Sequence, residues 1–303
     1  MTARRVAGRP RESGVTRDAP SRALKVFSSI LAPTTVLTAL LFYFGTQHAN
    51  AFYGWFGVHY SVLGLSVADY LIRASDGMTV PITAVAAVGL ATLWANRLLE
   101  ARLSPRAWQT LLRRAVPVLA VAGIVLVVVG LTGLAEPALL YRFAGLPGLC
   151  IAVGFLFFPL ADRLHQARTG RRGSPTAAVV QWTFTFVLVT IGAFWSVTDY
   201  SAALGERRAY EYEVALPTMA DTVVFSGKDL GLRARGVKVT PCAPDAQYRF
   251  RYDGLVLVQQ SGGTSMLLPR QWNRADGTAI LLPASGDVRL EFAPNGTSRD
   301  RTC

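Results

Sequence analysis

His59 and Asp69 are the two residues of this sequence whose types best suit proton transfer. An imidazole titrates near neutral pH, and a carboxylate beside it can orient the ring and stabilise its charged form. Both residues lie in the stretch FYGWFGVHYSVLGLSVADYLIR, residues 52–73. Isolated histidines are, however, more often surface residues than bases, so we do not expect this pair to be catalytic.

The common motifs of enzymes and cofactor-binding proteins are absent from the sequence. It contains no Gly-x-Ser-x-Gly elbow, no His-Glu-x-x-His pair, no glycine-rich phosphate loop with a lysine, and no carboxylates paired at helical spacing. Only three histidines and three cysteines are present, and they are scattered. We therefore predict no catalytic residue, no cofactor and no metal site, and an enzyme is not the favoured class.

The composition indicates a membrane protein. Of its 303 residues 51% are hydrophobic and 17% are charged, whereas soluble proteins carry about 25% charged residues. A transmembrane helix needs about 20 apolar residues to cross a hydrocarbon core of about 30 Å. Five stretches meet this length, at residues 26–45, 77–96, 115–135, 145–161 and 179–198. The predicted fold class is a membrane all-α bundle of five transmembrane helices (residues 26–201), followed by a small all-β domain.

The basic residues predict how these spans are oriented. Sixteen of them lie before the first span or in the connections between spans two and three and between spans four and five. The alternate connections hold one each, Arg73 and Arg142. The positive-inside rule then places the basic tail, residues 1–25, in the cytoplasm and the C-terminal domain outside the cell membrane. The arginine clusters are expected to contact anionic lipids, and they account for the net charge of +12 without nucleic acid.

A cleaved signal peptide is an alternative for the first span. Ala49-Asn50-Ala51 resembles the small-residue site at which signal peptidase cuts. A polar leader of about 25 residues, an apolar run interrupted by Pro33, and the length of that run all favour retention. The other four spans keep their orientation in either case.

The aromatic stretch falls in a predicted outer loop, residues 46–76. Ser66 is suited to cap the helix that follows, with Asp69 three residues on as its partner. Large apolar side chains gain roughly 1.5–3 kcal/mol each on burial, so we expect the loop to be ordered against lipid, the helices or the outer domain. It is either a folded lid or an interaction site, whose candidate residues are Phe52, Tyr53, Trp55, Phe56, His59, Tyr60, Ser66, Asp69 and Tyr70.

A β-domain is predicted over residues 222–303, after a linker at 202–221. Apolar and polar residues alternate there between turn signals, which is typical of strands. The candidate strands lie at 222–226, 248–252, 254–260, 264–269, 278–283 and 288–292. Short strands of this number predict a small sandwich or barrel.

The cysteines leave two interpretations open. Cys150 lies in the fourth span, where a single thiol behaves as a small apolar residue. Cys242 and Cys303 are the only cysteines of the outer domain. Either they form a disulfide, which would stabilise the domain by roughly 4 kcal/mol, or both are free thiols.

Two segments of the sequence resemble a known family. FYFGTQHANAFYGWFGVHYSVLGLSVADYL, residues 42–71, and YRFRYDGLVLVQQSGGTSMLLPRQW, residues 248–272, are similar to uncharacterised multi-pass membrane proteins of actinobacteria. The resemblance covers most of residues 42–292 and implies a bacterial source, which the preference for arginine over lysine also favours. It implies no activity.

The favoured function is therefore that of a non-enzymatic membrane protein that presents its β-domain for binding or envelope assembly. A channel or transporter component, and an envelope enzyme acting on lipid or cell-wall substrates, are the alternatives. The expected partners are the lipid bilayer and an envelope protein or a second copy of the chain.

Overall fold

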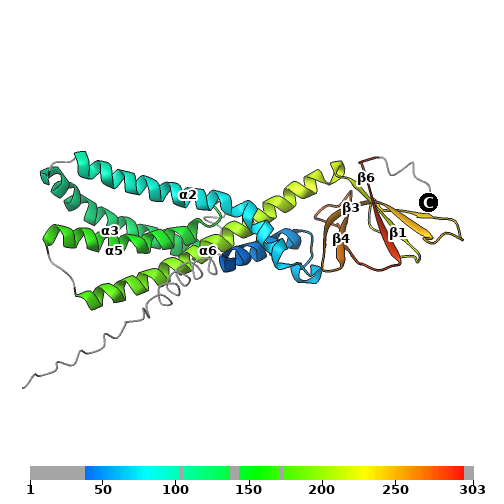
Figure 1. Cartoon of the computed structure of the whole chain (residues 1–303), viewed down its shortest axis with the longest axis horizontal. Helices are drawn as coiled ribbons and strands as arrows, with labels where there is room; N and C mark the ends of the chain where they lie inside the picture. The colour runs from blue at the N-terminus through cyan, green and yellow to red at the C-terminus, as the bar shows by residue number, and fades with distance from the viewer. Residues whose placement is uncertain (1–37, 103–104, 137–142, 171–173, 297–303) are drawn as a thin grey trace, which may run out of the picture. The chain divides into compact units, whose positions relative to one another are not determined.

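A computed structural model describes residues 38–102, 105–136, 143–170 and 174–296. The chain divides into two compact units, residues 1–40 and residues 41–303, and the contacts described below lie within the second. Residues 38–55 are helical. The helices that follow are η1 (Tyr60–Leu63), α2 (Val67–Arg102), α3 (Pro105–Ala135), α5 (Leu146–Thr169), α6 (Pro175–Ala215) and η2 (Leu216–Thr218) (Figure 1).

Among the described residues, three helices are long and apolar enough to cross a membrane: Arg113–Ala135, Leu146–Gln166 and Thr176–Thr218. They coincide with the third, fourth and fifth predicted spans. The second predicted span, 77–96, lies within helix α2, and most of the first, 26–45, lies outside the described residues. Five spans and their orientation therefore stay a prediction.

Helices α3, α5 and α6 pack through glycines. A Cβ atom on Gly123 would lie 3.0 Å from the carbonyl oxygen of Gly154, and one on Gly192 would lie 2.8 Å from that of Gly148. Small residues at these positions let the helix backbones approach closely, as in many membrane bundles. Large apolar side chains point away from the bundle, and Phe186 is 70% exposed. Such a surface suits lipid better than water.

Helix α6 does not end where its apolar span ends. Its 41 residues extend about 60 Å, twice the thickness of the hydrocarbon core. The linker predicted at 202–221 is helical over most of its length, because the helix continues to Ala215 and η2 to Thr218. Apolar and polar residues alternate within 206–215 as they do in a strand. The Ala, Glu and Arg residues of this segment nevertheless favour a helix. The pair Arg207–Glu211, 3.0 Å apart at i and i+4, and the burial of Ala209 add tertiary support.

The outer loop predicted at 46–76 is largely helical as well. The first helix continues to residue 55, and α2 begins at Val67. The physical reason is the spacing of His48, Phe52 and Phe56, which places these buried side chains on one face of a helix. Only residues 56–66, including η1, connect the two helices.

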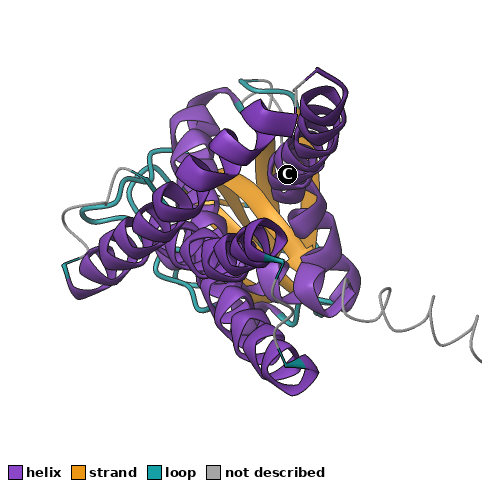
Figure 2. Ribbon diagram, turned by 90° about the vertical axis from the view of Figure 1, so that its left-hand side faces the viewer, coloured by secondary structure: helices purple, strands orange, loops and turns teal. Residues whose placement is uncertain are grey.

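The C-terminal domain is one antiparallel sheet. Its strands are β1 (Asp221–Ser226), β2 (Lys238–Pro241), β3 (Phe250–Ser261), β4 (Thr264–Pro269), β5 (Ile280–Pro283) and β6 (Val288–Ala293). The order is β5-β4-β3-β1-β6, with β2 also paired to β3. Figure 2 shows the strands in orange. Two predicted strands merge into β3, because Gly254 adopts a φ of 87° and lets the chain pass through an irregular position. The short strand β2 was not predicted.

Both faces of the sheet are covered. Leu267 of β4 belongs to one buried cluster with Val224, Tyr252 and Leu255. Its neighbours Met266 and Leu268 belong to a second cluster, which includes residues of the helices. Successive side chains of a strand point to opposite faces, so β4 is buried on both sides. The second cluster joins the sheet to the helices.

The described residues test the predicted disulfide only in part. Cys150 is buried and free, whereas Cys242 is disulfide-bonded. Cys303 lies outside the described residues. The pairing of Cys242 with Cys303 therefore stays a prediction.

Candidate functional site

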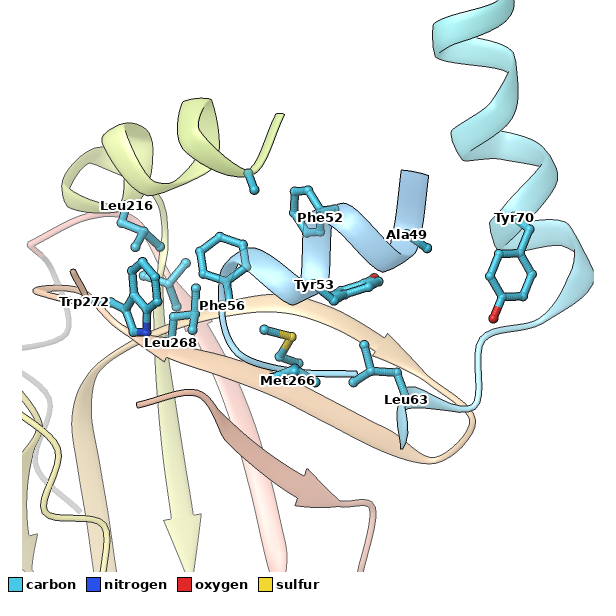
Figure 3. Packing of buried hydrophobic residues seen from close by; sticks show 13 residues of the cluster. Ala49, Phe52, Tyr53, Phe56, Leu63, Tyr70, Leu216, Met266, Leu268 and Trp272 are labelled. Atoms are coloured by element: carbon cyan, nitrogen blue, oxygen red, sulfur yellow. The ribbon is translucent and has the colours of Figure 1, made fainter. Parts of the chain in front are cut away.

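The aromatic stretch lies in a buried cluster between the helices and the sheet, which we call the junction. Figure 3 shows Phe52 and Tyr53 on the first helix, and Phe56 directly after it, beside Met266, Leu268 and Trp272 of the sheet domain. The rings of Phe56 and Trp272 meet edge to face, with centroids 4.9 Å apart. The other members of the junction are Ala49, Val58, Leu63, Tyr70, Ala209, Leu216 and Val256. Each large side chain buried there contributes roughly 1.5–3 kcal/mol.

The junction places most of the candidate loop residues in a core rather than on a surface. Phe52, Tyr53, Phe56 and Tyr70 are buried, and Tyr60 packs against them. Trp55 is half-buried and donates from Nε1 to a carboxylate oxygen of Glu213, over 2.8 Å. The guanidinium of Arg274 lies 4.0 Å from the ring centroid of Trp55. The aromatic residues therefore join the helices to the sheet.

Ser66 and Asp69 form the predicted cap at the start of α2. The backbone N–H of Ser66 donates to Asp69 Oδ2 over 2.8 Å, and the N–H of Asp69 donates to Ser66 Oγ over 3.2 Å. The hydroxyl of Ser261, at the end of β3, donates to the same Oδ2 over 2.9 Å. The backbone bond from Ser66, together with the two serine hydroxyls, lowers the pKa of Asp69 from its usual value. The capping carboxylate of Asp69 therefore also binds the end of strand β3.

The tip of the β3–β4 hairpin touches the turn before α2. A Cβ on Gly64 would lie 3.1 Å from the Cα of Gly262. Both glycines have positive φ angles, 58° and 56°, which residues with a side chain rarely adopt. Glycine is therefore required at both positions for this close contact.

Arg73 is a further candidate site residue, which the sequence alone did not indicate. From Nη2 its guanidinium donates to the hydroxyl oxygen of Tyr53 and, over 3.1 Å, to Oε1 of Gln259 in β3. It also lies 4.9 Å from the Tyr53 ring centroid and 5.2 Å from that of Phe52. In the sequence Arg73 is only a basic residue of a predicted outer connection. Its position one helical turn after Asp69 was the signal available in the sequence.

Beside the junction lies a cavity of about 640 Å³. Its lining comes from the first helix, α2, α6 and β3. The charged lining residues are Asp69, Arg73, Arg208 and Glu211. The buried ring of His48 and the side chains of Phe52, Ile72, Tyr212, Met219 and Val258 also line it. Burial raises the pKa of Tyr212 to about 12, so this phenol remains neutral at physiological pH.

Several polar side chains around the junction are held by hydrogen bonds to their neighbours. Among the described residues no hydrogen bond joins His59 to Asp69, because His59 Nδ1 bonds Ser61 Oγ over 2.7 Å instead. The oxygens of Glu211 accept from Arg207 and Arg208. Within the same part of the chain, no three His, Cys, Asp or Glu side chains group as metal ligands. Charged groups that are held in this way can recognise a ligand.

Comparison with models of known families, with curated proteins and with solved structures finds no match. The resemblance to uncharacterised actinobacterial membrane proteins therefore stays an expectation. The two segments that carry it, residues 42–71 and 248–272, are also the segments that meet in the junction.

Proposed function

We propose that this protein is a non-enzymatic protein of the cell membrane that presents its β-domain outside, for binding or envelope assembly, in a fixed relation to five transmembrane helices. The alternation of basic residues along the chain supports the orientation. The three membrane-capable helices support the anchor. The observation that carries the proposal is the junction, because a domain that only needed tethering would not require a buried core shared with the helices.

The connection from α6 to the sheet supports the same conclusion. Only two residues separate η2 from β1. Arg270 donates to the carbonyl oxygens of Leu216, Pro217 and Met219 over 3.2, 2.7 and 2.9 Å. These carbonyls follow directly after the C-terminus of helix α6, where a cation is favoured. The carboxylate of Asp221 in β1 accepts from Arg270 too, so one side chain joins helix and strand.

In a domain coupled to the helices in this way, the binding of a partner on one side of the membrane would affect the helices on the other side. A partner bound to the sheet changes the free energy of α6 and α2 through the junction, since differential contacts are what bias a conformational equilibrium. A channel would require a conducting path through the helices. An enzyme would require a side chain that can transfer a proton or attack a substrate and is not already held by hydrogen bonds to its neighbours.

Photo-crosslinking in cells tests the proposal. A benzophenone amino acid at Phe292 (56% exposed) or at Val239 (41% exposed) should give discrete protein adducts, and the same label at Phe186 should give lipid adducts. Arg270→Gln should weaken the adducts at Phe292 while the sheet stays folded by hydrogen exchange. Solute flux through proteoliposomes of the purified chain, above that of lipid alone, would instead support the channel alternative and overturn the proposal.

A further inference from the structure

We propose that the cavity beside the junction binds the phosphodiester group of a membrane lipid, with Arg73 as its principal ligand. The inference rests on the proposed membrane placement of the helices. It does not depend on whether the β-domain has a protein partner, so the two proposals can fail separately.

The depth of the cavity suits a lipid phosphate. Arg73 precedes the predicted second span, 77–96, by four residues, which corresponds to about 6 Å along a helix. His48 follows the first span, 26–45, by three residues, or about 5 Å. The headgroup layer on each side of a bilayer is roughly 5–8 Å thick. Arg73 and His48 therefore line the cavity at the level where lipid phosphates lie.

Arg73 has donor capacity to spare. A guanidinium has five N–H donors, and both hydrogen bonds described above leave from Nη2 and end on neutral oxygens of Tyr53 and Gln259. Burial raises the pKa of Tyr53 to about 12, so its hydroxyl does not neutralise the arginine. Within the described residues, Nε and Nη1 of Arg73 have no acceptor, and no carboxylate forms an ion pair with it. An anion would satisfy these donors.

The acidic residues of the cavity favour a singly charged anion. Asp69 lies one turn before Arg73 and offsets part of its field, although its Oδ2 is directed to Ser66 and Ser261. Glu211 is held by Arg207 and Arg208. A dianionic phosphate would be repelled by both carboxylates more strongly than a phosphodiester with one negative charge. Membrane phospholipids with two ester bonds to phosphate provide that charge.

The apolar lining suits an amphiphile. Phe52, Met219 and Val258 line the cavity, and Ile72, which also lines it, is 69% exposed. An exposed isoleucine just outside a predicted span is well placed to contact the glycerol and upper acyl carbons of a lipid. A polar headgroup could then extend toward Arg208, which lies ten residues beyond the span at 179–198, or about 15 Å along α6.

Native mass spectrometry of the full-length protein in detergent, titrated with phosphatidylglycerol, tests the assignment. Arg73→Gln should weaken lipid binding by about tenfold or more, since bidentate charge-assisted bonds are lost. Arg207→Gln is the matched control. It removes one positive charge, as Arg73→Gln does, but its side chain is 75% exposed and does not line the cavity. Arg208 still binds Glu211 in this variant. The affinity of Arg207→Gln for phosphatidylglycerol should equal that of the unaltered chain.

A second variant separates lipid binding from the structural role of Arg73. Ser75→Trp fills the cavity beside Ile72 and keeps every contact of Arg73, so it should also weaken lipid binding. Hydrogen exchange over residues 50–72 should remain slow in this variant. Unchanged lipid affinity in both Arg73→Gln and Ser75→Trp would overturn the proposal, and so would an equal loss in Arg207→Gln.

Soluble anions distinguish a lipid from free phosphate. Inorganic phosphate and glycerol 3-phosphate, titrated to millimolar concentration, should not displace phosphatidylglycerol. Displacement by inorganic phosphate at concentrations similar to the lipid would show that the cavity recognises a free anion, and it would overturn the lipid assignment. Flux or crosslinking results that contradict the proposed function leave this measurement unaffected.

Discussion

Ser261 and Asp69 are 192 positions apart in the chain, yet the hydroxyl of Ser261 donates to Oδ2 of Asp69 over 2.9 Å. The bond joins the end of β3 to the first turn of α2. Because the same oxygen accepts from Ser66, the start of α2 and the β3–β4 hairpin share one acceptor. Any change at this carboxylate should therefore affect both elements.

The stability of the junction should depend on the protonation of Asp69. Its folded-state pKa is lowered from 3.8, so the carboxylate contributes stability that is present above the unfolded pKa and is lost as pH falls through the folded pKa. Hydrogen exchange over residues 50–72, corrected for intrinsic rates, should be flat from pH 7 to 5 and accelerate below about pH 4. Asp69→Asn should remove this acid step. If exchange in Asp69→Asn accelerated at the same pH, the acceleration would come from another titrating group.

Substituting Gly262 should separate the hairpin from the turn before α2. An alanine Cβ there would lie 2.6 Å from the carbonyl oxygen of Gly64, which is closer than real contacts allow. Gly263→Ala is the control, because its φ of 74° imposes similar backbone strain but no atom lies within 4 Å. We expect faster exchange across residues 60–66 in Gly262→Ala than in Gly263→Ala. Equal rates would mean that the contact contributes nothing beyond strain.

Phe56→Ala should open the junction. The ring is 3% exposed and packs on Trp272, so its removal should cost about 3–5 kcal/mol. Phe186→Ala, on the outward surface of α6 at 70% exposure, removes the same atoms and should leave the junction unchanged. Hydrogen exchange and limited proteolysis over residues 50–72 measure the difference. Rapid exchange in the unaltered protein would contradict the buried junction.

The proposed orientation predicts which sites react with a membrane-impermeant thiol reagent. Cysteines introduced at Gly57 and Gly286, where no atom lies within 4 Å of an added Cβ, should be labelled in intact cells above the background of the native cysteines. A cysteine at Thr110, between the second and third predicted spans, should be labelled only after lysis. If only Thr110→Cys were labelled in intact cells, the orientation of the chain would be the reverse of the proposed one.

The pairing of Cys242 with Cys303 predicts a single free thiol, that of Cys150, in denatured and unreduced protein. Cys303→Ser should destabilise the β-domain by roughly 4 kcal/mol, because a loop of about 60 residues is no longer closed in the unfolded chain. Thermal unfolding of the outer domain measures this loss. A count of three free thiols would exclude the bridge.

Local patterns in the sequence determined the elements that depend on near neighbours. Three apolar runs became membrane-capable helices, since the length and hydropathy of a segment decide whether it can span a bilayer. The Ser66–Asp69 cap formed because its partners are three residues apart. Strands β1, β4 and β6 lie close to their predicted positions, because alternation is itself a local signal.

The tertiary structure alone decided how these elements meet. Residues 206–215 alternate like a strand, yet Ala209 is fully buried in the junction and the segment is helical. The aromatic residues of 52–56 signalled burial, but the surface that covers them comes from β3 and β4, some 200 positions later. Arg73 acquired its role from Tyr53 and Gln259. Such contacts join residues far apart in the chain, and their free energies outweigh weak local propensities, so no short window of sequence contains them.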